Sequence, residues 1–228
     1  MPIRDRTFLV TGASRGIGAD LARMLLAEGA KVVLAARSPC VLPDDGARSV
    51  GVQGDVAVDA DAARMVAAAE ERFDRLDVLV NNAAVLTPPA RVDDIAPETW
   101  RHVLDVNVIG TANLIRHAVP ALERAGGGLI VNMSSTWGRS AAARQAPYCA
   151  SKFAVEALTA SLAGELPAGI AAVAINPGVI ATDMLGTAFE GDVSMFPGPG
   201  SLRPHWRALF EQADASWSGR SLDLDTLA

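Results

Sequence analysis

TFLVTGASRGIG, residues 7–18, sets an apolar run directly before three closely spaced glycines, Gly12, Gly16 and Gly18. Helical spacing follows, so the stretch predicts a strand, a tight turn and the start of a helix. In such a turn one glycine makes the bend, one lets backbone N–H groups approach a pyrophosphate, and one lets the helix pack on the strand. The helix N-terminus supplies further N–H donors for the anion. A plain glycine-rich turn is the alternative.

The same alternation of short apolar runs and helical segments continues along the chain. Strands separated by helices imply right-handed crossovers and a parallel sheet covered on both faces. We therefore predict one α/β domain, residues 1–228, with a doubly wound Rossmann-type sheet. The expected strands are 7–11, 31–36, 49–53, 77–81, 128–133 and 170–175, and the expected helices are roughly 17–28, 59–73, 97–124, 149–165 and 203–213.

Composition excludes several classes of protein. Half of the 228 residues are hydrophobic and the net charge is −6, so neither a disordered chain nor a nucleic-acid or anionic-membrane surface is expected. Two cysteines, Cys40 and Cys149, make no disulfide framework. No zinc-ligand spacing occurs, so no metal is expected. No signal peptide and no run of eighteen apolar residues is present, so we expect a cytoplasmic protein.

The end of the second strand indicates which nucleotide would bind. An acidic residue there would bond the ribose 2′-hydroxyl of NAD, whereas this sequence reads AARS, residues 35–38, with Arg37. A guanidinium suits a 2′-phosphate, and Arg15 could add a second contact. The sequence therefore predicts NADP(H) over NAD(H). The alternative is that both arginines are solvated surface charges.

The only tyrosine, Tyr148, stands four residues before Lys152, one of only two lysines. Positions i and i+4 of a helix share a face, so both side chains can point at one site. Eighteen of the twenty basic residues are arginine, and lysine differs in being a compact charge with a tunable pKa. A surface Tyr–Lys pair is the alternative.

Taken together, the motifs resemble the classical short-chain dehydrogenase/reductase family over residues 6–183. They are TGASRGIG (11–18), GDV (54–56), NNAA (81–84), DVNVIG (105–110), VNMSS (131–135), YCASK (148–152) and NPGVIATDM (176–184). The resemblance implies a catalytic set of Asn107, Ser135, Tyr148 and Lys152. Tyr148 would transfer the proton, with its pKa lowered by the Lys152 ammonium, and Ser135 would bond the substrate oxygen. Asn107 would interrupt its helix and anchor a water linked to Lys152.

The resemblance also implies the residues that contact the cofactor. They are Gly12, Ser14, Arg15, Gly16, Ile17, Gly18, Arg37, Asp55, Val56, Asn82, Ala83, Tyr148, Lys152, Pro177, Gly178, Ile180 and Thr182. Two features depart from the family. Ala84 stands where a glycine is usual, and SGRSLDLDTLA, residues 218–228, looks like a shortened C-terminal end. Because that end often builds the subunit interface, the oligomer is in doubt between a dimer, which we favour, and a tetramer.

The expected activity is hydride transfer between NADP(H) and a small or medium apolar ketone or secondary alcohol. Residues 184–204 are rich in Gly and Pro yet carry apolar side chains, which favours a substrate lid over a poorly ordered loop. The alternative function is a non-catalytic NADPH-binding regulator on the same fold, because fold alone does not fix function.

Overall fold

A computed structural model describes residues 2–40 and 46–227. Within them, seven strands form one sheet in the order β3-β2-β1-β4-β5-β6-β7, and every neighbouring pair is parallel. The strands are β1 Thr7–Thr11, β2 Lys31–Ala36, β3 Ser49–Gln53, β4 Val78–Asn81, β5 Gly128–Met133, β6 Ile170–Asn176 and β7 Ser221–Asp223. The predicted doubly wound α/β sheet is confirmed. Its strand order reverses between β1 and β4, where such sheets bind ligands.

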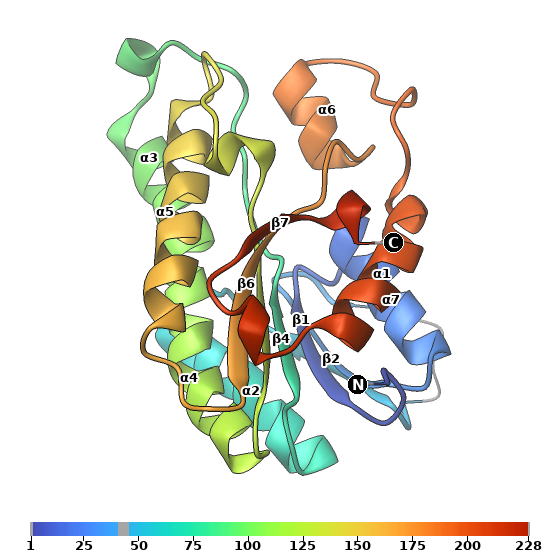
Figure 1. The fold of residues 1–228 in the computed structure, drawn as a ribbon. Coiled ribbons are helices and arrows are strands. Elements are labelled where there is room, and N and C mark those ends of the chain that lie inside the picture. Colours follow the sequence, from blue (N-terminus) through green and yellow to red (C-terminus); the bar gives the residue numbers. More distant parts are fainter. Residues whose placement is uncertain (1, 41–45, 228) are drawn as a thin grey trace.

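Helices cover both faces of this sheet (Figure 1). The α-helices are α1 Gly16–Ala27, α2 Asp59–Phe73, α3 Pro97–Leu104, α4 Gly110–Arg124, α5 Ala146–Ala163, α6 Asp183–Phe189 and α7 Arg203–Gln212. One hydrophobic cluster joins α1 and α7 to the sheet through Leu21, Leu25, Trp206 and Phe210. The cluster on the opposite face joins α2 and α4 through residues such as Met65 and Leu114. All residues of β1 and β6 are buried, as expected for strands covered on both sides.

Three elements go beyond the expected ranges of strands and helices. The helical range predicted over 97–124 is interrupted by a π-helical segment, Asp105–Ile109, between α3 and α4, where the resemblance implied an interruption at Asn107. The predicted lid region contains α6, whose N-cap Thr182 accepts a hydrogen bond from the Leu185 backbone N–H. The shortened C-terminal end forms β7, whose three residues pair with Ala174–Asn176 of β6.

The extent of the domain, residues 1–228, stays a prediction, and residues 1, 41–45 and 228 lie outside the described residues. Among the helices of the described part, none has both the length and the apolar character that a bilayer crossing requires.

Candidate active site

A cavity of about 550 Å³ opens at the carboxyl ends of the strands and brings most of the predicted site residues together. Of the predicted residues, its lining includes Gly12, Ser14, Arg15, Gly16, Ile17, Arg37, Asp55, Val56, Asn82, Ala83, Tyr148, Lys152, Pro177 and Thr182. Gly18, Gly178, Ile180, Asn107 and Ser135 do not form part of this lining. Ile180 is buried in the core beside α1 and α7, which explains its absence from the cavity wall.

Two of the three glycines at the turn between β1 and α1, Gly12 and Gly18, have no room for a side chain. Gly12 has a φ of +66°, and a Cβ on it would lie 2.8 Å from Nδ2 of Asn82. A Cβ on Gly18 would lie 2.5 Å from both the Gly12 carbonyl oxygen and Asn82 Nδ2. The backbone therefore lines this part of the cavity directly, ahead of the N-terminus of α1. This geometry fits a dinucleotide pyrophosphate.

Side-chain hydrogen bonds tie the ends of β1 and β4 together beneath the turn. The Thr11 hydroxyl accepts from the backbone N–H groups of Asn82 and Ala83, both at 3.0 Å. In return, Asn82 Nδ2 donates to the Thr11 carbonyl oxygen at 2.7 Å. Asn82 thereby holds the turn in place and packs against Gly12 and Gly18. The sequence analysis expected only a cofactor contact at Asn82 and did not predict this structural role.

At the end of β2, Arg37 is exposed and lines the cavity next to Ala36. Arg15 also lines it, and its guanidinium lies 3.5 Å from Asp183, the first residue of α6. Both side chains of this ion pair are more than three-quarters exposed, so the pair is weak and Arg15 can turn to another anion. The corner therefore offers two guanidinium groups beside the second strand.

Tyr148 and Lys152 lie on α5, and both line the cavity. The Lys152 ammonium lies 5.5 Å from the centre of the Tyr148 ring and donates to the Met133 carbonyl oxygen at 2.6 Å. Burial lowers the pKa of Lys152 to about 8, against a smaller upward effect of Glu156. Burial raises the pKa of Tyr148 to about 12, against a hydrogen bond from Ser135 that lowers it. The predicted lowering of the tyrosine pKa is therefore wrong for this structure, because desolvation outweighs every other influence on the phenol.

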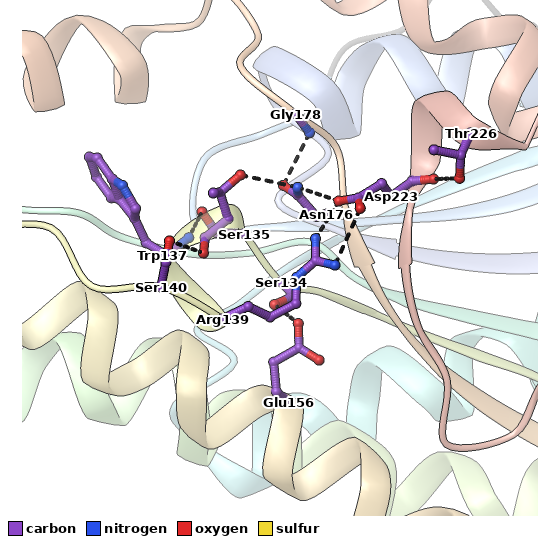
Figure 2. A network of polar contacts seen from close by, with 11 residues as sticks. Ser134, Ser135, Trp137, Arg139, Ser140, Glu156, Asn176, Gly178, Asp223 and Thr226 are labelled. Atoms are coloured by element: carbon purple, nitrogen blue, oxygen red, sulfur yellow. Dashed lines mark hydrogen bonds and ion pairs between the residues drawn. The ribbon is translucent and has the colours of Figure 1, made fainter.

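Ser135 and Ser134 point to different partners. Ser135 follows β5, accepts a hydrogen bond from the Trp137 backbone N–H at 3.1 Å and bonds Tyr148. Ser134 donates to Glu156 on α5 at 2.5 Å (Figure 2). Ser134 therefore fixes the end of β5 against α5, while the Ser135 hydroxyl stands beside the phenol. The Trp137 ring also meets the Tyr148 ring edge-on, with centroids 6.0 Å apart.

Asn107 lies in the π-helical segment and is 1% exposed. Its side-chain oxygen accepts from the Val85 N–H at 2.8 Å, and its Nδ2 donates to the Val85 carbonyl and to Ser151 Oγ. The Ser151 hydroxyl in turn donates to the Tyr148 carbonyl oxygen at 2.7 Å. The expected interruption of the helix is present, and the side chain joins the loop after β4 to the tyrosine helix.

A family model described as short chain dehydrogenase matches residues 6–192, most of the chain. The chain belongs to this family. The NADPH-dependent pterin aldehyde reductase of Arabidopsis thaliana is 38% identical over 226 residues, covering 96% of this chain and 93% of that protein. The structure of a 3-ketoacyl-(acyl-carrier-protein) reductase from Brucella melitensis complexed with NADH has a TM-score of 0.85 and 29% identity, covering 97% of both chains. A short chain dehydrogenase from Escherichia coli CFT073 complexed with NADPH has a TM-score of 0.86 and 28% identity, covering 98% of both.

In this short-chain dehydrogenase the cavity also contains residues that the sequence did not single out. They are Ala36, Ser38, Gly54, Val85, Val106, Met133, Ser134, Ala181, Asp183 and Met184, with Ala84 noted only as a departure. All of the ten except Val85 lie inside AARS or one of the quoted motifs, and Val85 directly follows NNAA, so membership of a motif was the available signal. In the described part of the chain, no cluster of three or more His, Cys, Asp or Glu side chains is arranged to hold a metal ion.

Proposed function

We propose that this member of the family is an NADP(H)-dependent carbonyl reductase that also works as an alcohol dehydrogenase in reverse. The observation that carries the proposal is the meeting of Tyr148, Ser135 and Lys152 beside a cavity whose far corner carries Arg37. Relatives of the chain are named as oxidoreductases, which supports catalysis over the alternative of a non-catalytic regulator.

The preference for NADP(H) rests on the end of β2. Ala36 and Arg37 line the cavity where an NAD-selective site would need a carboxylate for the ribose 2′-hydroxyl. The guanidinium of Arg15 can leave its weak ion pair with Asp183 and add a second positive charge at this corner. Among the similar proteins, the Arabidopsis reductase and the Escherichia coli structure carry NADPH in their names, while the Brucella structure holds NADH. The arginines of this chain therefore favour the phosphorylated nucleotide.

When bound, NADPH supplies the hydride that reduces the carbonyl carbon. The Tyr148 phenol, with a pKa of about 12, is protonated at neutral pH and donates its proton to the oxygen that gains charge. Ser135 stands beside that phenol and stabilises the same oxygen. Lys152, with a pKa of about 8, keeps its proton at pH 7 and places a positive charge beside the tyrosinate left behind. Asn107 bonds the loop after β4 and, through Ser151, the helix α5 that carries Tyr148 and Lys152.

We propose a small or medium, largely apolar carbonyl compound as the substrate. Trp137 packs against Tyr148, and Met184 of α6 lines the cavity, so apolar side chains flank the proton donor. Phe189 and Phe196 pair with ring centroids 5.7 Å apart within the predicted lid region 184–204. This pairing supports an ordered lid that excludes water over the site. The aldehyde reductase relative makes aromatic aldehydes a reasonable first panel.

The deciding experiment compares the parent protein with Tyr148→Phe. We expect the parent to bind NADPH more tightly than NADH in a fluorescence titration and to oxidise NADPH with a panel of aldehydes and ketones. Tyr148→Phe should lose about 10²-fold or more of turnover, because the phenol acts in proton transfer, and should keep its NADPH affinity within about threefold. Retained turnover would refute the assigned proton donor, and absence of turnover in the parent would refute the enzyme proposal.

A cytoplasmic location and a homo-oligomer stay predictions.

A further inference from the structure

Asp223, at the end of β7, lies beside Asn176, the last residue of β6, in the register of the sheet. Its carboxylate receives two partners. Asn176 Nδ2 donates to Oδ1 at 2.7 Å, and the Arg139 guanidinium forms an ion pair with both carboxylate oxygens. Figure 2 shows Arg139 reaching this carboxylate from the loop that carries Ser135. The C-terminal strand is thus bonded directly to the serine loop.

Asn176 extends the contact to two segments of the proposed site. Its Nδ2 also donates to the hydroxyl of Thr136, the residue after Ser135, at 3.1 Å. Its Oδ1 accepts the backbone N–H of Gly178 at 3.1 Å, in the Pro177–Gly178 segment predicted to contact the cofactor. One 7% exposed amide therefore connects the serine loop, the cofactor segment and β7.

The orientation of that amide depends on the carboxylate. An ionised carboxylate only accepts hydrogen bonds, so it requires the NH₂ group of Asn176, and not its oxygen, to face β7. With the NH₂ group held there, the oxygen is available to the Gly178 N–H. A neutral or absent partner at position 223 would let the amide turn over, and the Gly178 bond would be lost, whereas the Thr136 hydroxyl can rotate to donate to the amide oxygen. Arg139 and Asn176 hold the pKa of Asp223 below its usual range, which keeps it ionised at neutral pH.

A contribution to folding stability does not account for the Arg139–Asp223 ion pair. The side chains of Arg139 and Asp223 are 36% and 40% exposed, and ion pairs as exposed as this contribute little to folding. We propose that Asp223 is a positioning residue of the hydride-transfer site, which acts through Asn176 to hold Ser135 and Pro177–Gly178 in their working positions, while Arg139 keeps its carboxylate ionised. The proposal rests on the proposed function and adds a residue to it.

The test is a double-mutant cycle between Asp223→Ala and Asn176→Ala, with Asp223→Asn as the mild variant. We expect Asp223→Ala to lower kcat/KM by about tenfold, because small misplacements of reacting groups are costly. In the Asn176→Ala background, Asp223→Ala should change kcat/KM by less than twofold, since its route to the site is already cut. Multiplicative losses in the double variant would overturn the proposal. Asp225→Ala, two residues further on and exposed, is the matched control and should leave kcat/KM unchanged.

A second readout needs no turnover. Hydrogen exchange of the free protein should show faster exchange of the Gly178 and Trp137 amides in Asp223→Ala, and an intermediate change in Asp223→Asn, while β1 amides keep their protection. Unchanged exchange at both amides would overturn the positioning role even if activity fell. If the parent turns over no carbonyl, the proposed function fails by itself, and the exchange data still decide whether Asp223 holds the two segments.

Discussion

The buried ammonium of Lys152 destabilises the folded protein. Replacing Lys152 by an uncharged residue should therefore raise the free energy of unfolding at neutral pH. The side chain is 3% exposed, and burial lowers its pKa from 10.5 to about 8. At about 1.4 kcal/mol per pKa unit, keeping the ammonium in the folded protein costs about 3 kcal/mol at pH 7. Lys152→Met keeps the length of the side chain and removes the charge.

The variant also loses one favourable contact. Lys152 Nζ donates to the Met133 carbonyl oxygen at 2.6 Å, and leaving a buried acceptor without a donor costs about 1–2 kcal/mol. We therefore expect Lys152→Met to raise the free energy of unfolding by about 1–2 kcal/mol at pH 7. The same variant should have no useful turnover, because the charge beside Tyr148 is gone.

The difference in free energy of unfolding between Lys152→Met and the parent should change sign at high pH. Between pH 8 and 10.5 the unfolded parent keeps the lysine proton while the folded parent releases it, so the parent becomes more stable as the pH rises through this window. Near pH 10 about three-quarters of the cost of the buried charge has disappeared from the parent, which leaves about 0.8 kcal/mol. The lost hydrogen bond of about 1–2 kcal/mol then outweighs that remaining cost, and Lys152→Met should be the less stable protein by up to about 1 kcal/mol.

Urea unfolding followed by circular dichroism at pH 7 and pH 10 measures both differences. Lys31→Met is the control, because it removes the other lysine from a partly exposed position over the Phe73 ring. The difference in free energy of unfolding between Lys31→Met and the parent should not change sign between pH 7 and pH 10. If Lys152→Met were destabilised equally at both pH values, the buried ammonium would carry no cost and the electrostatic reasoning about this site would be refuted.

Two further changes test the cofactor side of the cavity. Arg37→Asp should lower NADPH affinity by about tenfold or more relative to NADH, since a carboxylate repels a 2′-phosphate and accepts from a 2′-hydroxyl; an unchanged affinity ratio in fluorescence titrations would show that Arg37 does not contact the phosphate. Gly18→Ala places a Cβ 2.5 Å from the Gly12 carbonyl oxygen, so it should lower the free energy of unfolding by about 1–3 kcal/mol and weaken NADPH binding. Gly186→Ala on α6, where the nearest atom to a new Cβ is 3.7 Å away, should change neither, and equal effects of both changes would contradict the packing argument.

The glycine turn and the positions of six of the strands along the chain could be predicted from sequence because the information is local. An apolar run, three glycines and helical spacing occur within twelve residues, and each feature specifies the conformation of its own segment. The same holds for Tyr148 and Lys152, whose separation of four residues places them on one side of α5. Local pattern therefore predicted the frame and the two side chains at its centre.

Long-range contacts account for what the sequence did not predict. The segment 97–124 has helical periodicity throughout, so only the family resemblance, and no local pattern, predicted the interruption at Asn107. The π-helical segment occurs where Asn107 bonds the backbone of Val85, 22 residues away. The direction in which the Tyr148 pKa shifts depends on how much water the folded chain excludes from the phenol, and the sequence does not show this. The helix α6 could have been predicted from local sequence, because Thr182 caps its N-terminus. The dense Gly and Pro residues after it favoured the prediction of a loop.

The electrostatics of the site explain why its positioning must come from polar contacts around it. At neutral pH the buried Lys152 ammonium has a desolvation cost, and burial keeps the Tyr148 phenol uncharged, so the charge at the centre of the site does not stabilise the fold. The contacts that hold them are neutral amides and hydroxyls whose hydrogen bonds are nearly complete, as at Asn107 and Asn176. Such groups fix direction without a charge of their own. Glu156 is the charged exception, since it accepts from Ser134 and raises the pKa of Lys152. Asp223 is charged, but it lies at the outer end of β7 and reaches the site through a neutral amide, so it can set the geometry of the site while its field is screened by Arg139.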